Sequence, residues 1–209
     1  MSKTFIWIGG VIIILIALMF WGAKGADIRP PFEFGSIHPL DNIKGKIDSK
    51  TVIIEYSDFQ CPACRTYYFM VKELMAEFGG KAVFVYRHFP LAEIHANAEP
   101  AARAAEAAKK QGKFWEMHDL LFEKQDEWDK VANIQPMFES YAKLLGISVE
   151  QFKIDFASKE VKDFVRAQRN HAIKSGLQGT PTFFVNGKKI QNPTSVEAFR
   201  AIIKDAPAN

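Results

Sequence analysis

The sequence predicts an α/β domain, and three observations support this fold class. Patterns for a strand, a helix and a second strand follow one another over residues 51–88. Helical patterns then fill residues 93–176, and strands return at residues 182–191 before a last helix. The two strands of a strand–helix–strand unit normally lie parallel. The helical stretch is therefore an insertion between two parts of one sheet.

The first unit is well marked in the sequence. Residues 51–57 form an apolar run of strand length, rich in β-branched and aromatic residues. Apolar residues then recur at helical spacing to about Phe78, where two glycines end the pattern. A second apolar run over residues 81–88 predicts the second strand.

Five helices are predicted in the insertion. An alanine-rich segment follows Pro100, a residue suited to the first helical turn. Apolar spacing marks three of the other helices, and Ser148 with Gln151 forms a capping box before the fourth. The expected ranges are 101–110, 114–122, 137–145, 149–157 and 161–172.

The C-terminal part reads as a hairpin and a helix. Residues 182–185 and 188–191 are expected as strands, joined by Asn186-Gly187, the strongest short hairpin signal. Thr194 with Glu197 forms a capping box that would open the last helix.

The N-terminal residues predict a membrane anchor. Residues 5–23 carry no charge, and at 1.5 Å per residue a helix of that length spans about 28 Å, close to the thickness of a bilayer core. This run is long for a cleaved signal peptide, so we expect a retained single-pass anchor at residues 1–24. Residues 25–50, interrupted by Pro and Gly, are expected to be a tether with short extended pieces packing on the domain, which spans residues 51–205.

The charge composition bears on nucleic acid as a partner. The net charge is +3, with acidic and basic residues well mixed and no basic stripe. This pattern gives no support for nucleic-acid binding.

The two cysteines lie in one motif, Cys61-Pro62-Ala63-Cys64, where the first strand passes into the helix. Unpaired N–H groups and the positive dipole end at a helix N-terminus lower the pKa of a thiol there. Cys64, one turn on, can reach Cys61 and close a small disulfide. Pro62 falls in the first turn, where its missing N–H costs nothing.

Two other uses of the cysteine pair are less favoured. A structural zinc site needs about four ligands, whereas the chain has no further cysteine and its five histidines lack the paired spacing of zinc ligands. A structural disulfide across so short a loop would restrict the unfolded chain very little. Redox chemistry is therefore the favoured interpretation.

With these motifs in this order, the chain resembles the thioredoxin fold, and its inserted helices resemble the DsbA-like branch of thiol–disulfide oxidoreductases. The similarity runs from about residue 45 to residue 205. The matching stretches are Ile54–Cys64, Phe84–Leu91, His95–Ala108 with Phe114-Trp115, and Gly179–Gly187.

The resemblance implies roles for particular residues. Cys61 matches the exposed nucleophile, Cys64 the resolving cysteine, and Pro181 the family's cis-proline beside the motif. An ordinary trans proline at the start of an edge strand is the alternative for Pro181. The backbone of Thr180 would pair with an extended substrate. The expected substrate contacts are Thr180, Pro62 and Ala63.

Three further expectations concern charged or missing groups. In the family, a buried acid at the position of Glu55 assists proton transfer at the buried cysteine, although the residues alone equally allow a solvated charge on a strand face. The strongest oxidants of the branch carry His at the position of Ala63, so Cys61 is expected to be less acidic here. Asp58, Arg87 and His88 are expected at the surface or at strand ends.

The sequence thus predicts a membrane-tethered thiol–disulfide oxidoreductase on the extracytoplasmic side, which donates its disulfide to exported polypeptides through a mixed disulfide. The resemblance implies reoxidation by a quinone-linked membrane partner of the DsbB or VKOR kind, and no metal or organic cofactor. Two alternatives stay open: a reductase or isomerase kept reduced by a membrane donor, and a tethered peptide-binding or holdase module with a structural disulfide.

Overall fold

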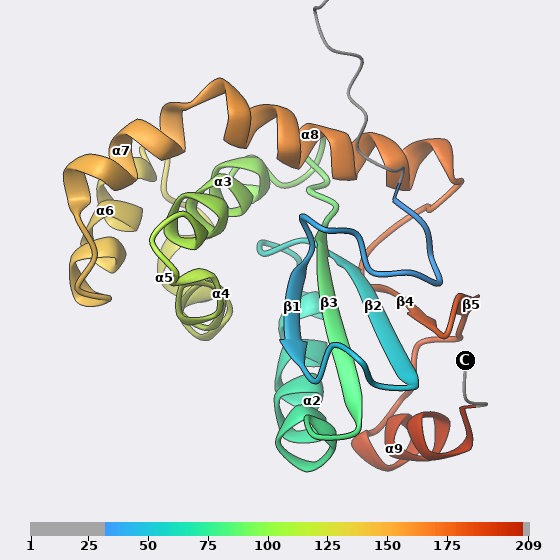
Figure 1. The fold of residues 1–209 in the computed structure, drawn as a ribbon. Helices are drawn as coiled ribbons and strands as arrows, with labels where there is room; N and C mark the ends of the chain where they lie inside the picture. Colours follow the sequence, from blue (N-terminus) through green and yellow to red (C-terminus); the bar gives the residue numbers. More distant parts are fainter. Residues whose placement is uncertain (1–31, 207–209) are drawn as a thin grey trace, which may run out of the picture. The chain divides into compact units, whose positions relative to one another are not determined.

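A computed structural model describes residues 32–206 of the protein (Figure 1). The predicted anchor at residues 1–24, and residues 25–31 of the predicted tether, lie outside the described residues. Within residues 32–206, no helix combines the length and apolar character needed to cross a bilayer. The strands are β1 Asn42–Gly45, β2 Thr51–Ser57, β3 Ala82–His88, β4 Thr182–Val185 and β5 Lys188–Lys189. The helices are α2 Pro62–Phe78, α3 Ala98–Lys109, α4 Phe114–Glu123, α5 Gln125–Trp128, α6 Gln135–Leu144, α7 Val149–Ala157, α8 Lys159–Lys174 and α9 Val196–Asp205.

The five strands form one sheet in the order β1-β3-β2-β4-β5. β2 and β3 are parallel, which confirms the predicted strand–helix–strand unit. β4 pairs antiparallel with β2, so β2 is central, and it is buried along nearly its whole length. Helices α3 to α8 lie between β3 and β4 in the chain, which confirms the helical insertion. Figure 1 shows this insertion beside the sheet, with α8 returning across the top of the view.

The strands alternate their side chains between two cores. Ile53, Phe84 and Phe183 belong to the larger core, which also holds the buried faces of α2 and α9. Ile54 and Tyr56 point the other way, into a smaller core that includes part of α8. Because successive strand residues face opposite sides of a sheet, Glu55 shares the face of Ile53, beneath α2.

The structure differs from the predicted elements at several ends. β1 lies inside the predicted tether and pairs antiparallel with β3, so residues 42–45 belong to the sheet. The short helix α5 has no counterpart in the prediction. α3 begins at Ala98, ahead of Pro100. Ser195 rather than Thr194 caps α9, by accepting from the Ala198 N–H.

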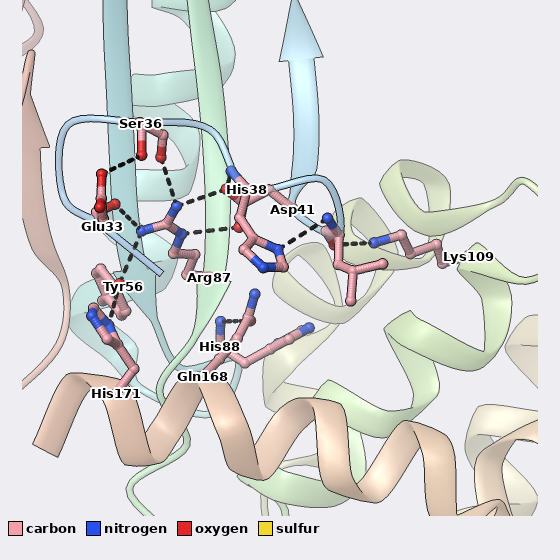
Figure 2. Close-up of polar contacts among 11 residues, drawn as sticks. Glu33, Ser36, His38, Asp41, Tyr56, Arg87, His88, Lys109, Gln168 and His171 are labelled. Atoms are coloured by element: carbon pink, nitrogen blue, oxygen red, sulfur yellow. Dashed lines mark hydrogen bonds and ion pairs between the residues drawn. The ribbon is translucent and has the colours of Figure 1, made fainter. Parts of the chain in front are cut away.

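A buried polar network holds the segment before β1 against the sheet (Figure 2). Arg87, at the end of β3, donates from Nε and Nη2 to the Asp41 carboxylate at 2.9 and 2.7 Å. Its guanidinium also donates to the backbone oxygens of Glu33 and Ser36 at 2.5 and 2.9 Å. The side chains of Arg87 and Asp41 are fully buried. This network explains why residues 32–41 pack on the domain.

The expectation of surface positions for Asp58, Arg87 and His88 is wrong, because all three are buried. Arg87 and His88 do end a strand, as the prediction allowed. His88 Nε2 lies 2.8 Å from Glu106 Oε1. Arg87 and His88 thus have buried polar partners, and Asp58 Oδ2 accepts from the Leu91 N–H and lies 2.7 Å from His95 Nδ1; a single strand pattern does not reveal such partners.

Candidate active site

Cys61 occupies the N-cap position of α2, and Pro62 follows in the first turn. The Cys61 backbone is extended, and its side chain makes no capping bond. Cys64 lies one turn further along. Both cysteines are free thiols in the structure; Cys61 keeps 8% of its surface exposed, whereas Cys64 has none. The two sulfurs are therefore unequal in access, as a nucleophile and a resolving group would be.

The two thiols also differ in acidity. Hydrogen bonding from the Cys64 thiol, helped by the backbone N–H groups of Cys64 and Ala63, lowers the pKa of Cys61 from 9.0 to about 6, against an opposing effect of burial. Burial, and then the neighbouring Cys61, raise the pKa of Cys64 well above its usual value. At neutral pH, Cys61 is thus the sulfur that carries the negative charge.

Pro181 lies next to this thiol, and the Thr180–Pro181 peptide bond is cis, as predicted. The Cys61 Sγ lies 3.6 Å from the Thr180 backbone oxygen, to which the thiol donates when it is protonated. Pro62 and Ala63 are exposed on the helix side of the same thiol. The structure therefore brings together every residue predicted around the motif, although their contacts with a substrate remain a prediction.

Glu55 is buried, with 3% of its surface exposed, so the alternative of a solvated charge is wrong. Burial, with a smaller contribution from the nearby Cys61 and against a hydrogen bond from Ser57, raises the pKa of its carboxyl from 4.5 to about 8. Among the described residues, its Oε1 has no hydrogen-bond partner. The carboxyl borders a cavity of about 10 Å³, room for about one water molecule, that His118 and Asp119 also line. Glu55 is therefore protonated at neutral pH and can give up a proton.

A set of amides that the sequence patterns do not predict joins the motif to the helical insertion. Gln125 of α5 donates from Nε2 to the backbone oxygens of Phe59 and Cys61, at 2.7 and 3.1 Å. In return, Gln60 donates to the Asp129 backbone oxygen at 2.6 Å and accepts from the Asn97 N–H at 2.7 Å. The insertion thus holds the backbone on which Cys61 sits.

A signal for Gln125 was present in the sequence. It lies three residues after Phe122 and three before Trp128, so on a helix it would share their face. Both aromatic residues are buried, and Gln125 is buried with them. A polar residue on an apolar helical face needs a partner, and here that partner is the active-site loop.

This geometry fits thiol–disulfide exchange. A thiol of low pKa at a helix N-terminus is largely ionised at neutral pH, and the thiolate is the reactive form of a cysteine. A second thiol one turn away can displace a mixed disulfide, and a buried acid can supply a proton to it.

Comparisons with known proteins agree with this geometry. Residues 39–205 match the family model described as thioredoxin. Among solved structures, a thioredoxin-like oxidoreductase from Silicibacter pomeroyi is 25% identical with a TM-score of 0.67, over 80% of this chain and 92% of that one. Alpha-DsbA1 from Wolbachia pipientis is 21% identical with a TM-score of 0.72, over 81% and 92% of the two chains.

The curated relatives that match by sequence are longer proteins, and they are named as Na⁺/H⁺ antiporters. A Na⁺/H⁺ antiporter NhaA 3 from Salinispora tropica is 36% identical over 169 residues, which are 81% of this chain and 25% of that protein. The chain thus spans about a quarter of the length of the curated relatives it matches. The antiporter name describes the whole relative, whereas the family model covers most of this chain. The chain therefore belongs to the thioredoxin family and has the fold of its DsbA-type members.

Proposed function

We propose that this chain is a thiol–disulfide oxidoreductase that donates a Cys61–Cys64 disulfide to exported polypeptides through a mixed disulfide on Cys61. The observation that carries the proposal is the pair of unequal thiols. Cys61 keeps 8% of its surface exposed, has a pKa of about 6 and lies 3.6 Å from the Thr180 oxygen, whereas Cys64 is fully buried.

The reaction takes two exchange steps. A substrate thiolate attacks Cys61 Sγ, the Cys61–Cys64 bond breaks, and Cys64 leaves with the electron pair. A second substrate thiolate then attacks the substrate sulfur of the mixed disulfide, and Cys61 leaves as a thiolate. The substrate has lost two electrons and two thiol protons, and the cysteine pair has gained the electrons. A leaving thiol of low pKa departs faster, which favours Cys61 in the second step.

Glu55 has a role in the first step. The departing Cys64 sulfur is buried and has a raised pKa, so it must take up a proton. Glu55 still holds its proton at neutral pH, and its charge is coupled to both cysteines. We assign to Glu55 the donation of this proton to Cys64. Water in the adjoining cavity then returns a proton to Glu55.

The direction of electron flow follows from the acidity of Cys61. Ionisation of this thiol stabilises the reduced pair, and a stabilised reduced form makes the disulfide a stronger oxidant. A pKa of about 6 lies between the values of about 3.5 in DsbA and about 7 in thioredoxin. This order agrees with Ala63 standing where the strongest oxidants carry His. The chain would thus be a moderate oxidant.

The proposal places the domain outside the cytoplasm, on a single-pass anchor at residues 1–24. A disulfide donor needs an oxidising compartment. The uncharged run of residues 5–23 supports the anchor, and the fusion of a similar domain to longer proteins named as antiporters fits a membrane setting. A quinone-linked membrane protein of the DsbB or VKOR kind would reoxidise the pair.

Trapping tests the proposal. With Cys64→Ala, Cys61 can form a mixed disulfide that nothing on the chain resolves, so non-reducing gels of cells should show adducts that a reducing agent releases. Cys61→Ser should show none. If the Cys64→Ala variant forms no adducts, the proposed roles are wrong. A peptide-binding module would keep its function with both cysteines replaced, and a pair found reduced in cells would indicate a reductase.

A further inference from the structure

A groove opens directly beside Cys61, along the exposed side of α2. It measures about 590 Å³ and lies between α2, α5 and the first turn of α9. Pro62, next to Cys61, lines it, and so does Gln125, whose amide bonds the Cys61 backbone oxygen. A polypeptide whose cysteine reaches Cys61 therefore has this groove within reach of its neighbouring residues.

The groove has an apolar part, formed by side chains of α2 and α9. Phe69 leaves 51% of its surface exposed, and Met70 beside it also lines the groove. Val196 closes the far wall. Met adapts its shape to different partners, and an exposed aromatic ring gives a large contact area. These side chains can receive an apolar residue of a substrate.

The charges of the groove leave one acid unpaired. Arg65 is bound to Asp126, with 2.6 Å between Nη1 and Oδ2, so these two charges offset each other. Glu73 is bound to Arg200 at 3.1 Å. Within residues 32–206, the carboxylate of Asp129 has no ion pair and no hydrogen bond. Its backbone oxygen accepts from the side chain of Gln60, the residue before Cys61, and both Asp129 and Pro62 line the groove, so Asp129 is tied to the loop that carries the thiol.

We infer that this groove selects substrate segments in which an apolar residue and a basic residue flank the reactive cysteine. Asp129 is the residue that pairs with the basic side chain, and Phe69 receives the apolar one. The inference rests on the proposed function, because the substrate reaches the groove through exchange at Cys61. An exposed ion pair changes affinity up to about fivefold, and a like charge opposes binding by a similar factor.

The experiment uses reduced peptides that each contain two cysteines. The peptides differ at a single position beside the first cysteine, where they carry Lys, Ser or Glu after a fixed Leu. The oxidised full chain is mixed with each, and kcat/KM is measured. Glutathione, which lacks these flanking residues, reports exchange at Cys61 itself. We expect Lys to exceed Glu by roughly fivefold or more, and 1 M salt to reduce this ratio, because screening weakens exposed ion pairs.

Two variants test the residue assignment. Asp129→Asn should bring the Lys-to-Glu ratio close to one. Glu127→Gln removes one negative charge from α5, two residues before Asp129 and outside the groove, and it should leave the ratio unchanged. Phe69→Ser should lower kcat/KM for the Leu peptides relative to peptides with Ser in place of Leu.

The possible failures are distinct. Oxidation of every peptide at equal rates, or a Lys preference that survives Asp129→Asn or 1 M salt, would overturn the inference and leave the proposed function standing. No oxidation of any peptide or of glutathione would overturn the proposed function and the inference with it.

Discussion

The Cys61 thiol lies 3.6 Å from the backbone oxygen of Thr180, although 119 positions separate the two residues in the chain. β2 and β4 are neighbours in the sheet, so the loop after β2 and the loop before β4 meet at the same edge. The contact puts the reactive sulfur beside a stretch of backbone that an extended polypeptide can pair with.

The reactivity of Cys61 should depend on pH with a midpoint near 6. Its folded pKa lies below the usual value of 9.0, so the thiolate also stabilises the folded, reduced chain above pH 9, and this stabilisation is lost as the pH falls to about 6. Alkylation rates of the reduced chain, measured from pH 4 to pH 10, check the midpoint. Cys64→Ala should raise it, because the Cys64 thiol is the main cause of the shift. A midpoint at the usual value of 9.0 in the wild type would show that the site does not acidify Cys61.

Glu55→Gln should stabilise the folded protein at neutral pH and slow its thiol–disulfide exchange. The carboxyl keeps its proton to about pH 8 when folded, whereas the unfolded chain releases it near pH 4.5. The wild type is therefore fully stable below pH 4.5 and loses stability as the pH rises to 8. The substitution should raise the free energy of unfolding by about 3 kcal/mol at pH 7 and by little at pH 4. Urea unfolding at the two pH values measures this difference.

The same Glu55→Gln variant should lose turnover by about 10²-fold, the lower end of a general acid–base contribution. Glu106→Gln offers a matched comparison, since this second buried acid bonds His88 and Asn42 rather than the cysteine pair. It should destabilise the fold and leave the pH profile of turnover in place. Equal turnover in Glu55→Gln and the wild type would remove Glu55 from the reaction.

Gln125→Ala should weaken the fold and change the acidity of Cys61. The substitution removes the Nε2 donor from the backbone oxygens of Phe59 and Cys61, which costs about 1–3 kcal/mol for buried groups. Because the amide fixes the backbone that carries the thiol, the alkylation midpoint should shift as well. Gln135→Ala, which removes a bond between neighbours on α6, is the control. A loss of stability with an unchanged midpoint would make Gln125 purely structural.

Arg87→Met should destabilise the domain by about 3–5 kcal/mol, because it leaves the Asp41 carboxylate buried without its partner. Adding Asp41→Leu should recover much of this loss, since an apolar pair can replace a buried ion pair. Denaturant unfolding of the two variants measures both effects. If the double variant is no more stable than the single one, the ion pair is not what holds residues 32–41 to the sheet.

The sequence was informative wherever a pattern is local. Local patterns predicted elements that the structure contains, namely β2, α2, β3, the Asn186-Gly187 turn and the helix start at the motif. The positions of Cys61 and Pro181 relative to one another came from resemblance, because they depend on which strands are neighbours.

What the sequence could not predict depends on partners far away in the chain. β1 is a short edge strand that exists through its pairing with β3, and its own residues carry no strand period. Arg87 reads as a surface residue until Asp41 is placed beside it. Glu55 has an ambiguous position until α2 covers its face of the sheet. In each case burial is decided by tertiary packing, which single-strand patterns do not contain.

The reduction potential of the Cys61–Cys64 pair, measured in glutathione buffers with the full chain, tests the role of disulfide donor most directly. A Cys61 pKa of about 6 predicts a potential between those of DsbA and thioredoxin, about −120 and −270 mV, so that the pair oxidises the thiols of structural disulfides. A potential below about −270 mV would contradict the account, because such a pair would draw electrons from few substrates and would act as a reductant.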